Sequence, residues 1–332
     1  MKAMLLRKHG PIEEAPLEYI DVPTPTPARG EVRVRISTCG ICHTDLHVIE
    51  GELTEGKPPV IPGHQIVGSV DVLGDGVSQS SVGDRVGIPW LHSTCGQCVY
   101  CKSGKENLCE NARFTGYHVD GGYAQYVTVS QDFAYHIPRG YPDAQAAPLL
   151  CAGVIGYRAL RLSEAEPGCR LGLYGFGASA HIVIQIARYR DCEVYVYTRG
   201  AGHQDLARRL GASWVGRAED GKPGTLDSAI IFAPAGSLVP HALEALRRGG
   251  TLALAGIYMT PIPQMDYRLL YHERTLRSVA NSTRQDVVEL LELAPKVPVH
   301  TEVQTFLLGE ANEALMLLKA GKIEGAAVLE MP

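Results

Sequence analysis

The segment 170–198 constrains the fold of this chain more than any other. An apolar run at 170–174 leads into the turn 175–180, which reads Gly-Phe-Gly-Ala-Ser-Ala. Apolar side chains then recur at helical spacing over 181–189, and a second apolar run follows at 193–198. A Gly-x-Gly-x-x-Ala turn between a strand and a helix, followed by another strand, is typical of the βαβ unit of a parallel sheet. We therefore predict an α/β domain here.

The same turn also indicates a ligand, because its glycines allow a pyrophosphate to approach the backbone and the helix N-terminus favours negative charge. At the end of the second strand an NAD site carries Asp or Glu, which binds the ribose hydroxyls. Here Thr198 and Arg199 occupy that place, and no carboxylate occurs before Asp205. A guanidinium can hold a 2′-phosphate with paired hydrogen bonds. We favour NADP(H) and keep NAD(H) as the alternative, in which Arg199 is only a solvated turn residue.

A group of potential metal ligands lies near the N-terminus. The segment 42–47 reads Cys-His-Thr-Asp-Leu-His, and His64 follows in a Gly-His-Gln triplet. Zinc takes sulfur and nitrogen donors, and a catalytic zinc keeps one position open for water or substrate. Cys42 and His64 supply two donors, and Cys151 is our candidate for the third. The alternative is that these are ordinary buried core residues.

A second cysteine pattern has a different spacing. Cys95, Cys98, Cys101 and Cys109 supply four thiols within fifteen residues. Four thiolates complete a tetrahedral shell and leave no position for substrate, so we predict a structural zinc site. An iron–sulfur cluster is the rival, but it usually has the fourth cysteine three residues further on, followed by proline. Metal-free thiols and a nucleic-acid-binding module are the remaining alternatives.

Size and charge limit the class of protein. The chain has 332 residues, more than one hydrophobic core usually supports, so two domains are expected. Its net charge of −5 argues against a nucleic-acid partner, which usually requires a basic patch. We see no signal peptide and no run of ~20 apolar residues, so we expect a cytoplasmic protein with no membrane partner. Nine cysteines in that compartment indicate metal or redox chemistry rather than disulfides.

The pattern of apolar residues changes along the chain. Short apolar runs broken by glycine and proline, such as the alternating segment 31–36, continue to about residue 137 and favour a β-rich, barrel-like domain. From about residue 148 the chain alternates strand and helix patterns, which favours a parallel sheet. The tail 325–330 predicts one more strand.

With these motifs in view, the chain resembles the zinc-dependent alcohol dehydrogenases of the medium-chain dehydrogenase/reductase superfamily. The resemblance covers nearly the whole length. It rests on the segment 42–47, on Gly63-His64, on the four cysteines of 95–109, on Leu-Cys-Ala-Gly at 150–153 and on the turn 175–180.

This resemblance implies a two-part α/β fold. Residues 1–147 would form a GroES-like, β-rich catalytic domain with a structural zinc lobe at 92–112. Residues 148–283 would form a Rossmann domain with a doubly wound, six-stranded parallel sheet. Residues 284–332 would return to the catalytic domain. The active site would lie in the cleft between the domains.

The resemblance also implies an activity, reversible hydride transfer between an alcohol and NAD(P)⁺ with two zinc ions per chain. Cys42, His64 and Cys151 would hold the catalytic zinc, which stabilises an alkoxide, and Cys39 would not be a ligand. Asp45 would fix the tautomer of the zinc histidine. Thr44 and His47 would form the proton relay. The substrate would be a small alcohol or aldehyde, and the assembly a homo-oligomer, either a tetramer or a dimer. The residues predicted to bind the cofactor are His43, Gly175, Phe176, Gly177, Ala178, Ser179, Thr198, Arg199, Ala233, Gly256, Ile257 and Asn281.

Three positions depart from the pattern of the family. Gln65 stands where the family usually has a glutamate that can ligate zinc transiently, so we expect a more electrophilic metal. Ala326 stands where an arginine usually grips the cofactor pyrophosphate, so Arg199 or Arg284 would have to replace it. Leu53 stands where ethanol-specialised relatives keep a tryptophan, while Trp90 matches the pattern. Leu53 should widen the substrate pocket towards longer or aromatic alcohols.

Two further functions remain open at this point. A polyol, cinnamyl-alcohol or formaldehyde dehydrogenase of the same fold differs only in its substrate. A non-catalytic NADP(H)-binding redox sensor or structural zinc protein would need neither the mixed sulfur and nitrogen ligand set nor the relay of Thr44 and His47.

Overall fold

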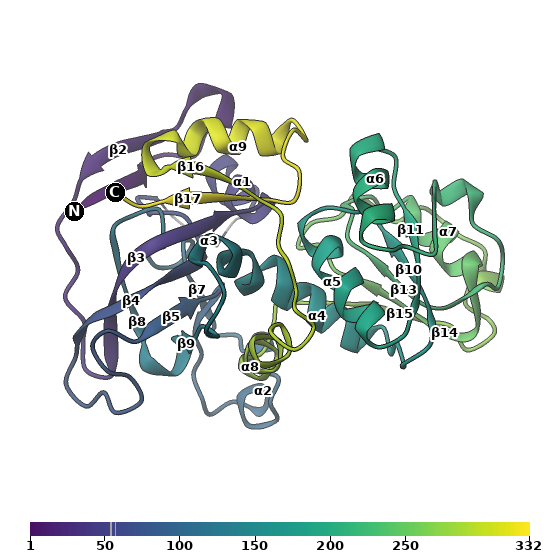
Figure 1. Ribbon diagram of the computed structural model, residues 1–332, viewed down its shortest axis with the longest axis horizontal. Coiled ribbons are helices and arrows are strands. Elements are labelled where there is room, and N and C mark those ends of the chain that lie inside the picture. The colour runs from purple at the N-terminus through teal and green to yellow at the C-terminus, as the bar shows by residue number, and fades with distance from the viewer. Residues whose placement is uncertain (54, 57) are drawn as a thin grey trace. The chain divides into compact units, whose positions relative to one another are not determined.

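The computed structural model describes residues 1–53, 55–56 and 58–332, which form two compact units (Figure 1). Unit 1 comprises Met1–Cys151, Ser282–Glu292 and Thr301–Pro332, and unit 2 comprises Ala152–Asn281 and Leu293–His300. These limits differ by a few residues from the predicted domains. They also show one excursion, 293–300, that the predicted return of 284–332 does not contain.

Unit 1 is built on a seven-stranded sheet in the order β16-β17-β3-β4-β5-β9, with β8 also paired to β3. All pairs in it are antiparallel except β16 and β17. The pairs β1–β2 and β6–β7 are separate two-stranded sheets. The strands of unit 1 are β1 (Lys2–Leu6), β2 (Leu17–Asp21), β3 (Glu31–Ile41), β4 (Gln65–Leu73), β5 (Arg85–Ile88), β6 (Leu91–Ser93), β7 (Arg113–Phe114), β8 (Tyr126–Ser130), β9 (Tyr135–His136), β16 (Val303–Leu307) and β17 (Ala326–Glu330).

The long strand β3 organises this unit. Val32, Val34 and Ile36 are buried, while Arg33 and Arg35 between them are partly or fully exposed, as the period of two in the sequence predicts. From residue 38 the strand is buried on both faces. Its first half pairs with β8 and its second half with β17, while β4 runs along its other edge. The helices of unit 1 are α1 (His43–Glu50), α2 (Val99–Lys102), α3 (Asp143–Ala146), α8 (Arg284–Leu293) and α9 (Ala311–Lys319).

Unit 2 is a six-stranded parallel sheet in the order β12-β11-β10-β13-β14-β15. This is the doubly wound order: β11 and β12 are added on one side of β10, and β13, β14 and β15 are added on its other side. Helices α5 and α7 lie on opposite sides of the sheet in Figure 1. The elements are β10 (Arg170–Tyr174), β11 (Glu193–Tyr197), β12 (Trp214–Gly216), β13 (Leu226–Ile231), β14 (Leu246–Leu254), β15 (Thr275–Ser278), α4 (Ala152–Leu162), α5 (Ala178–Tyr189), α6 (Ala201–Arg209) and α7 (Leu238–Ala245).

The excursion 293–300 joins unit 2 through specific contacts. Gln185 on α5 donates from Nε2 to the carbonyl of His300 and accepts the amide of His300 at Oε1, both at 2.8 Å. Ala294 and Val299 are buried beside this pair. The side chain of Gln185, on a helix distant in the sequence, therefore holds this segment in unit 2. The local sequence pattern of 293–300 does not reveal this contact.

Within the described residues, no helix is both long enough and apolar enough to cross a membrane.

Two glycines near the C-terminus allow a test of the packing of β17. Gly325 and Gly321 both adopt a positive φ, of 77° and 65°. A Cβ on Gly325 would overlap the backbone of Glu302, whereas a Cβ on Gly321 would meet nothing within 4 Å. We expect Gly321→Ala to cost about 1 kcal/mol of backbone strain. We expect Gly325→Ala to cost roughly 1–3 kcal/mol more, because the neighbouring backbone cannot move aside. Thermal unfolding of the two variants measures this difference, and equal melting temperatures would contradict it.

Candidate functional site

The N-terminus of helix α1 is closed by a reciprocal pair of bonds. Cys42 is the N-cap, and its Sγ accepts the amide of Thr44 at 3.3 Å. Asp45 reaches back, and its Oδ2 accepts the amide of Cys42 at 2.9 Å. This capping box fixes the Cys42 side chain at the start of the helix. His43, the first residue of the helix, is exposed.

His64 is held from behind by the same carboxylate. Its Nδ1 lies 3.0 Å from Asp45 Oδ1, and both side chains are 1% exposed. An imidazole that donates Nδ1–H to a carboxylate presents its Nε2 lone pair on the opposite side. The indole of Trp90 packs edge-to-face on the His64 ring at 4.8 Å. The ring of His64 therefore has one fixed orientation.

The three predicted ligands converge in unit 1. Nε2 of His64 lies 3.3 Å from Cys42 Sγ and 3.3 Å from Cys151 Sγ, and the two sulfurs lie 3.9 Å apart. A tetrahedral zinc with Zn–S of about 2.3 Å and Zn–N of about 2.05 Å would place two sulfurs about 3.8 Å apart and sulfur and nitrogen about 3.6 Å apart. The donor set fits zinc with a fourth position left open. Cys39 is fully buried and is not part of this group.

The three side chains of this group shift one another's pKa values in opposite directions. The hydrogen bond from Cys151 outweighs burial and lowers the pKa of Cys42 well below its usual value. The same bond, reinforced by burial, raises the pKa of Cys151 well above its usual value. Burial opposes a charged His64, but the Asp45 carboxylate and the Cys42 thiolate raise its pKa to about 10.

The predicted relay residues lie on α1, and one of them, His47, contacts a carboxylate that the sequence did not single out. Thr44 and His47 are three residues apart and share one side of the helix. Nδ1 of His47 contacts Oε2 of Glu52, which lies just past the helix end at Gly51. The amide of Glu52 donates to the carbonyl of His47 at 2.9 Å, so the turn itself brings the carboxylate back. In the sequence, the signal for this contact is Gly51, which ends the helix and turns the chain back towards His47.

Gln65 is the first residue of β4 and is 2% exposed. Its side chain lies against Gly40 on the neighbouring strand, where a Cβ would come within 3.0 Å of it. Within the part of the chain that the structure describes, its Nε2 has no hydrogen-bond partner. The substitution for glutamate therefore places a neutral amide beside His64, and its effect on the metal stays a prediction.

Leu53 and Trp90, predicted to line the substrate pocket, belong to one cluster. Trp90 stacks on Phe114 at 5.1 Å and on Tyr117 at 5.8 Å. The hydroxyl of Tyr117 accepts the amide of Glu55 at 2.7 Å and so anchors the segment that follows Leu53. Phe114 and Tyr117 were missed because nothing local in the sequence links them to Trp90.

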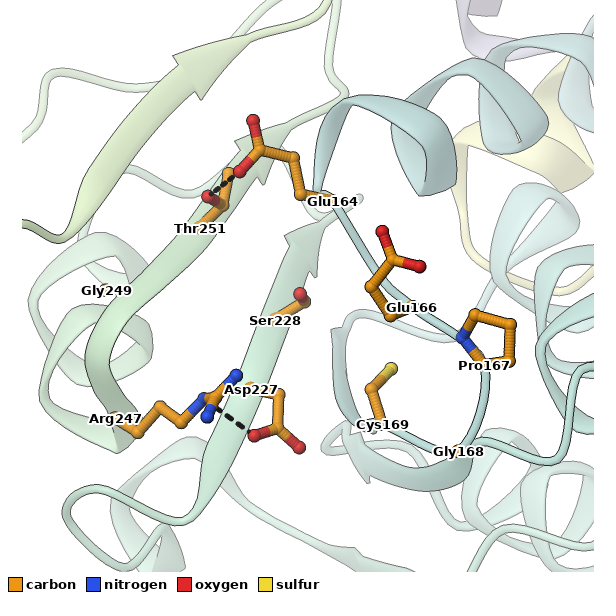
Figure 2. Close-up of a pocket in the computed structure, with 10 residues that line it drawn as sticks. All are labelled: Glu164, Glu166, Pro167, Gly168, Cys169, Asp227, Ser228, Arg247, Gly249 and Thr251. Atoms are coloured by element: carbon orange, nitrogen blue, oxygen red, sulfur yellow. Dashed lines mark hydrogen bonds and ion pairs between the residues drawn. The ribbon is translucent and has the colours of Figure 1, made fainter.

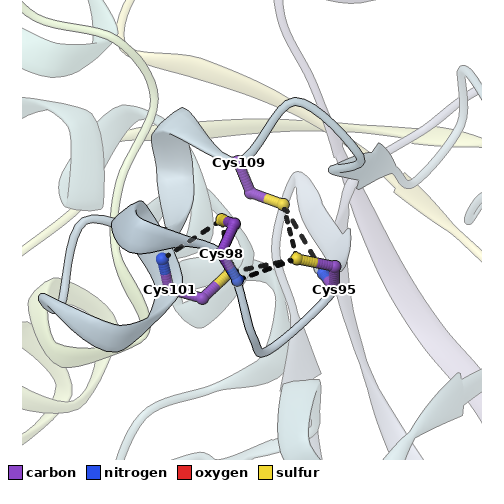
Figure 3. A group of neighbouring side chains, drawn as sticks. All are labelled: Cys95, Cys98, Cys101 and Cys109. Atoms are coloured by element: carbon purple, nitrogen blue, oxygen red, sulfur yellow. Dashed lines mark hydrogen bonds between the residues drawn. The ribbon is translucent and has the colours of Figure 1, made fainter.

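The four remaining predicted ligands form a separate cluster in unit 1 (Figure 3). Sulfur–sulfur distances are 3.6 Å for Cys95–Cys109, 3.5 Å for Cys98–Cys101 and 3.9 Å for Cys95–Cys101. Backbone amides of residues 95, 98 and 101 point at these sulfurs at 3.4–3.5 Å. The amides of Gln97 and Cys98 lower the pKa of Cys95 to about 6, whereas desolvation and the neighbouring thiols outweigh the Cys101 amide and raise the pKa of Cys98 to about 11. Four sulfurs in this arrangement fit a tetrahedral metal with no open position.

The glycine turn of unit 2 has the conformation that a dinucleotide site needs. Gly175 has φ +88°, and a Cβ there would press on the backbone of Ala233 at the end of β13. A Cβ on Gly177 would meet nothing within 4 Å, so that side of the turn is open. No side chain caps the N-terminus of α5, which begins at Ala178. Phe176 is buried and Ser179 is partly exposed in the same turn.

Other predicted cofactor residues lie at the same carboxyl edge of the sheet. Thr198 and Arg199 follow β11, and Arg199 is exposed. The next carboxylate along the chain, Asp205, is paired with Arg208 at 2.8 Å. Asn281 follows β15 with φ +55°, and its buried Nδ2 lacks a partner among the described residues. Gly256 and Ile257 follow β14, and Ile257 is exposed.

The arginine that the family usually carries near the C-terminus has no equivalent within β17, where Ala326 is buried. One proposed substitute, Arg284, lies 3.6 Å from Glu106 and over the ring of Phe133. It is therefore already engaged within unit 1.

Comparisons of the chain with family models and with known proteins all point to the same family. Residues 28–139 match the alcohol dehydrogenase GroES-like domain, and residues 180–296 match the zinc-binding dehydrogenase domain. The chain is 49% identical to the probable alcohol dehydrogenase AdhA of Mycobacterium tuberculosis, over 99% of this chain and 97% of that protein. It is 38% identical to an alcohol dehydrogenase of Geobacillus stearothermophilus, over 95% and 96% of the two chains.

Among solved structures, a cinnamyl alcohol dehydrogenase of Sorghum bicolor superposes with a TM-score of 0.91 at 28% identity, over 99% of this chain and 97% of that one. The fold predicted from the glycine turn and the β-rich N-terminal part is thereby confirmed. The chain belongs to the zinc-binding alcohol dehydrogenases of the medium-chain dehydrogenase/reductase superfamily, and is thus an oxidoreductase.

Proposed function

We propose that this protein is a zinc-dependent, NADP(H)-linked enzyme that interconverts alcohols and aldehydes. The observation that carries the proposal is the convergence of Cys42, His64 and Cys151 on one point, with Asp45 behind the imidazole. A ligand set with two sulfurs and one nitrogen leaves a fourth position for a substrate oxygen. A second zinc would be held by the four cysteines of the 95–109 cluster.

Zinc supplies Lewis acidity to the substrate oxygen, and the nicotinamide exchanges a hydride with the substrate carbon. The protein would supply position and proton transfer. Asp45 keeps His64 in the tautomer that leaves Nε2 available as a donor atom. Trp90 packs against that ring and limits the space beside it.

Thr44 and His47 would take up the proton that leaves the substrate hydroxyl and carry it towards solvent. Glu52 would receive Nδ1–H of His47, so that Nε2 faces the incoming proton. The side chain of His47 is 17% exposed and that of Glu52 is 51% exposed. Exposure therefore increases along the route, as a proton outlet requires.

The dinucleotide would bind at the carboxyl edge of the unit 2 sheet. Gly177 and the uncapped N-terminus of α5 would accept the pyrophosphate, and Asn281 has an amide without a partner in the described structure. Exposed Arg199, and the lack of a carboxylate in the sequence between β11 and Asp205, support NADP(H) over NAD(H).

Leu53 beside Trp90 supports longer or aromatic substrates over ethanol, because leucine leaves more room than tryptophan. The structural similarity to a cinnamyl alcohol dehydrogenase favours that substrate class as a second candidate. Neither Leu53 nor this similarity favours a polyol or formaldehyde as the substrate.

We also propose a homo-oligomer, a dimer or a tetramer. Strand β15 lies at the edge of its sheet, and the preceding segment exposes Ile262, Tyr267 and Tyr271. An open sheet edge beside apolar surface is a natural site for self-association. A cytoplasmic location stays a prediction.

Crossing cofactors with substrates tests the function. We expect higher kcat/KM with NADPH than with NADH across a panel of aldehydes, and higher kcat/KM for aromatic aldehydes than for acetaldehyde. Arg199→Ala should reduce kcat/KM with NADPH roughly tenfold, because one charge-assisted bidentate contact is lost, and should leave NADH nearly unchanged. Arg209→Ala, an exposed arginine at the end of α6, is the matched control. Equal rates with both cofactors in wild type and variant would reject the NADP(H) assignment.

Metal loading tests the ligand set. Zinc binds thiolates and a neutral imidazole, whereas the pKa values of His64 and Cys151 are raised in the metal-free protein. Zinc binding at this site should therefore release protons and should strengthen as pH rises. Calorimetry in buffers of different ionisation enthalpy measures the release, with a His64→Ala/Cys151→Ala variant subtracted to remove the four-cysteine contribution. An equal proton release in the two proteins would contradict the assignment. Two zinc ions per chain are expected, whereas one would favour a non-catalytic protein.

The relay is tested at Glu52. We expect Glu52→Gln to lower kcat about three- to tenfold with little change in KM, because the amide orients His47 less firmly. The solvent isotope effect on kcat should rise as proton transfer becomes slower. Glu55→Gln, which removes a nearby exposed carboxylate that does not contact His47, is the control. If both variants behave alike, Glu52 has no part in the relay.

A further inference from the structure

The nine cysteines fall into groups with different surroundings. Six belong to the two metal-ligand clusters, and Cys39 is fully buried in the core of unit 1. The remaining two, Cys169 and Cys192, form a pair in unit 2 with their sulfurs 3.4 Å apart. Neither takes part in the activity described above.

The pair sits at the amino ends of two neighbouring strands. Cys169 immediately precedes β10 and Cys192 immediately precedes β11, whose first residues, Arg170 and Glu193, are register partners. The amide of Glu193 donates to the carbonyl of Cys169 at 2.8 Å, so the backbone on both sides is fixed. Adjacent strands lie about 4.8 Å apart, which is within the Cα separation of about 4.4–6.8 Å that disulfides span. The strand spacing is therefore compatible with closing the sulfurs from 3.4 Å to about 2.05 Å.

A third metal site does not explain the pair. Throughout the described ranges, the only groups of three or more His, Cys, Asp or Glu with mutually close ligand atoms are the two clusters in unit 1. Two thiols without a third donor are a poor zinc site. Two thiols in contact are, however, the reduced form of a potential disulfide.

The two sulfurs are chemically unequal. Cys169 donates its S–H to Cys192, and this bond lowers the pKa of Cys192 to about 7. The same contact, together with burial, raises the pKa of Cys169. Cys192 Sγ also lies 3.5 Å from the carbonyl oxygen of Glu166 and 3.9 Å from that of Arg190, to which a protonated Cys192 can donate. Cys192 is therefore the more acidic of the two thiols, and thiolates are the reactive form.

The pair lies beside a pocket that leads to solvent. Cys169 lines a 270 Å³ pocket with polar walls that include Glu164, Glu166, Asp227 and Arg247 (Figure 2). Cys169 and Cys192 are each 7% exposed, whereas Cys39 is 0% exposed. Cys169 thus faces the pocket, and Cys192 lies in contact with it and keeps a small exposed fraction of its own, whereas Cys39 has none.

We propose that Cys169 and Cys192 form a reversible disulfide by exchange with a low-molecular-weight disulfide such as oxidised glutathione. The Cys192 thiolate attacks one sulfur of the reagent, a mixed disulfide forms, and one reagent thiolate leaves. Cys169 then loses its proton and attacks Cys192 Sγ, which expels the second reagent thiolate. Two electrons pass from the protein to the reagent, which is released as two thiols.

The bond would join the amino ends of β10 and β11. The glycine turn at Gly175 and residue Arg199 lie at the opposite, carboxyl ends of the same strands. The link should therefore stabilise unit 2 without obstructing the cofactor edge. This proposal does not depend on the substrate or cofactor assigned above.

The test uses the zinc-loaded full-length protein incubated with oxidised glutathione at pH 7.5, followed by blocking of free thiols and tryptic digestion. Residues 162–170 and 191–199 are tryptic peptides with one cysteine each. Mass spectrometry should find them cross-linked at least about tenfold more than any other cysteine pair, with zinc content unchanged. Dithiothreitol should reverse the link. The oxidised protein should melt about 5 °C higher, with alcohol dehydrogenase activity within about twofold.

Two variants complete the design. Cys169→Ser should leave Cys192 carrying a single glutathionyl group and no cross-link, whereas Cys192→Ser should react more slowly at Cys169. If a serine variant does not fold, alanine at the same position replaces it. A cross-link that appears only together with zinc loss, or wild-type protein whose 169 and 192 thiols stay reduced at millimolar reagent, would overturn the proposal. Equal melting temperatures of the two forms would overturn its stabilising role.

Discussion

The carboxylate of Asp45 connects the fold of unit 1 to its chemistry. It is buried, and it accepts the amide of Cys42 with one oxygen and meets Nδ1 of His64 with the other. A buried carboxylate is costly unless such partners satisfy it, so the three groups hold one another in place. Tyr123 lies beside them fully buried, and burial together with the Asp45 charge raises its pKa. The side chain of Asp45 thus caps the N-terminus of α1, positions Cys42 and orients the imidazole of His64.

Strand pairing explains why residues 42 and 64 meet. Strand β3 ends at Ile41 and β4 begins at Gln65, and the two run antiparallel with Gly40 opposite Gln65. Residues just beyond β3 and just before β4 must therefore emerge at the same end of the sheet. Gly40 is needed there because a Cβ would press into the Gln65 side chain. Cys151 arrives separately, after a short buried 3-10 turn that packs on β3, β4 and β5.

The sequence predicts the parts of this protein that repeat a local pattern with a physical reason. The turn at Gly175 is recognisable because φ and close packing both require glycine there. The four cysteines of 95–109 are recognisable because a short loop must supply a whole ligand shell. Contacts between segments that lie far apart in the sequence cannot be predicted in this way. The stacking of Trp90 on Phe114 and the capture of His300 by Gln185 depend on tertiary geometry, which no local spacing encodes. Glu52 is an intermediate case, since only the turn at Gly51 brings it back to His47.

The cysteines show why residue type alone does not decide chemistry. The thiols around 95–109 are surrounded by backbone amides, which favour thiolates and hence a metal. Cys42 and Cys151 both contact the imidazole of His64, and this mixed sulfur and nitrogen group is the one proposed to hold a metal with a position left for substrate. Cys39 has no exposed surface, and burial raises its pKa well above its usual value despite backbone hydrogen bonds from Gln65 and His64. Cys169 and Cys192 have each other and a polar pocket. Each environment removes some of the reactions open to a thiol, and the reactions that remain differ from one group to the next.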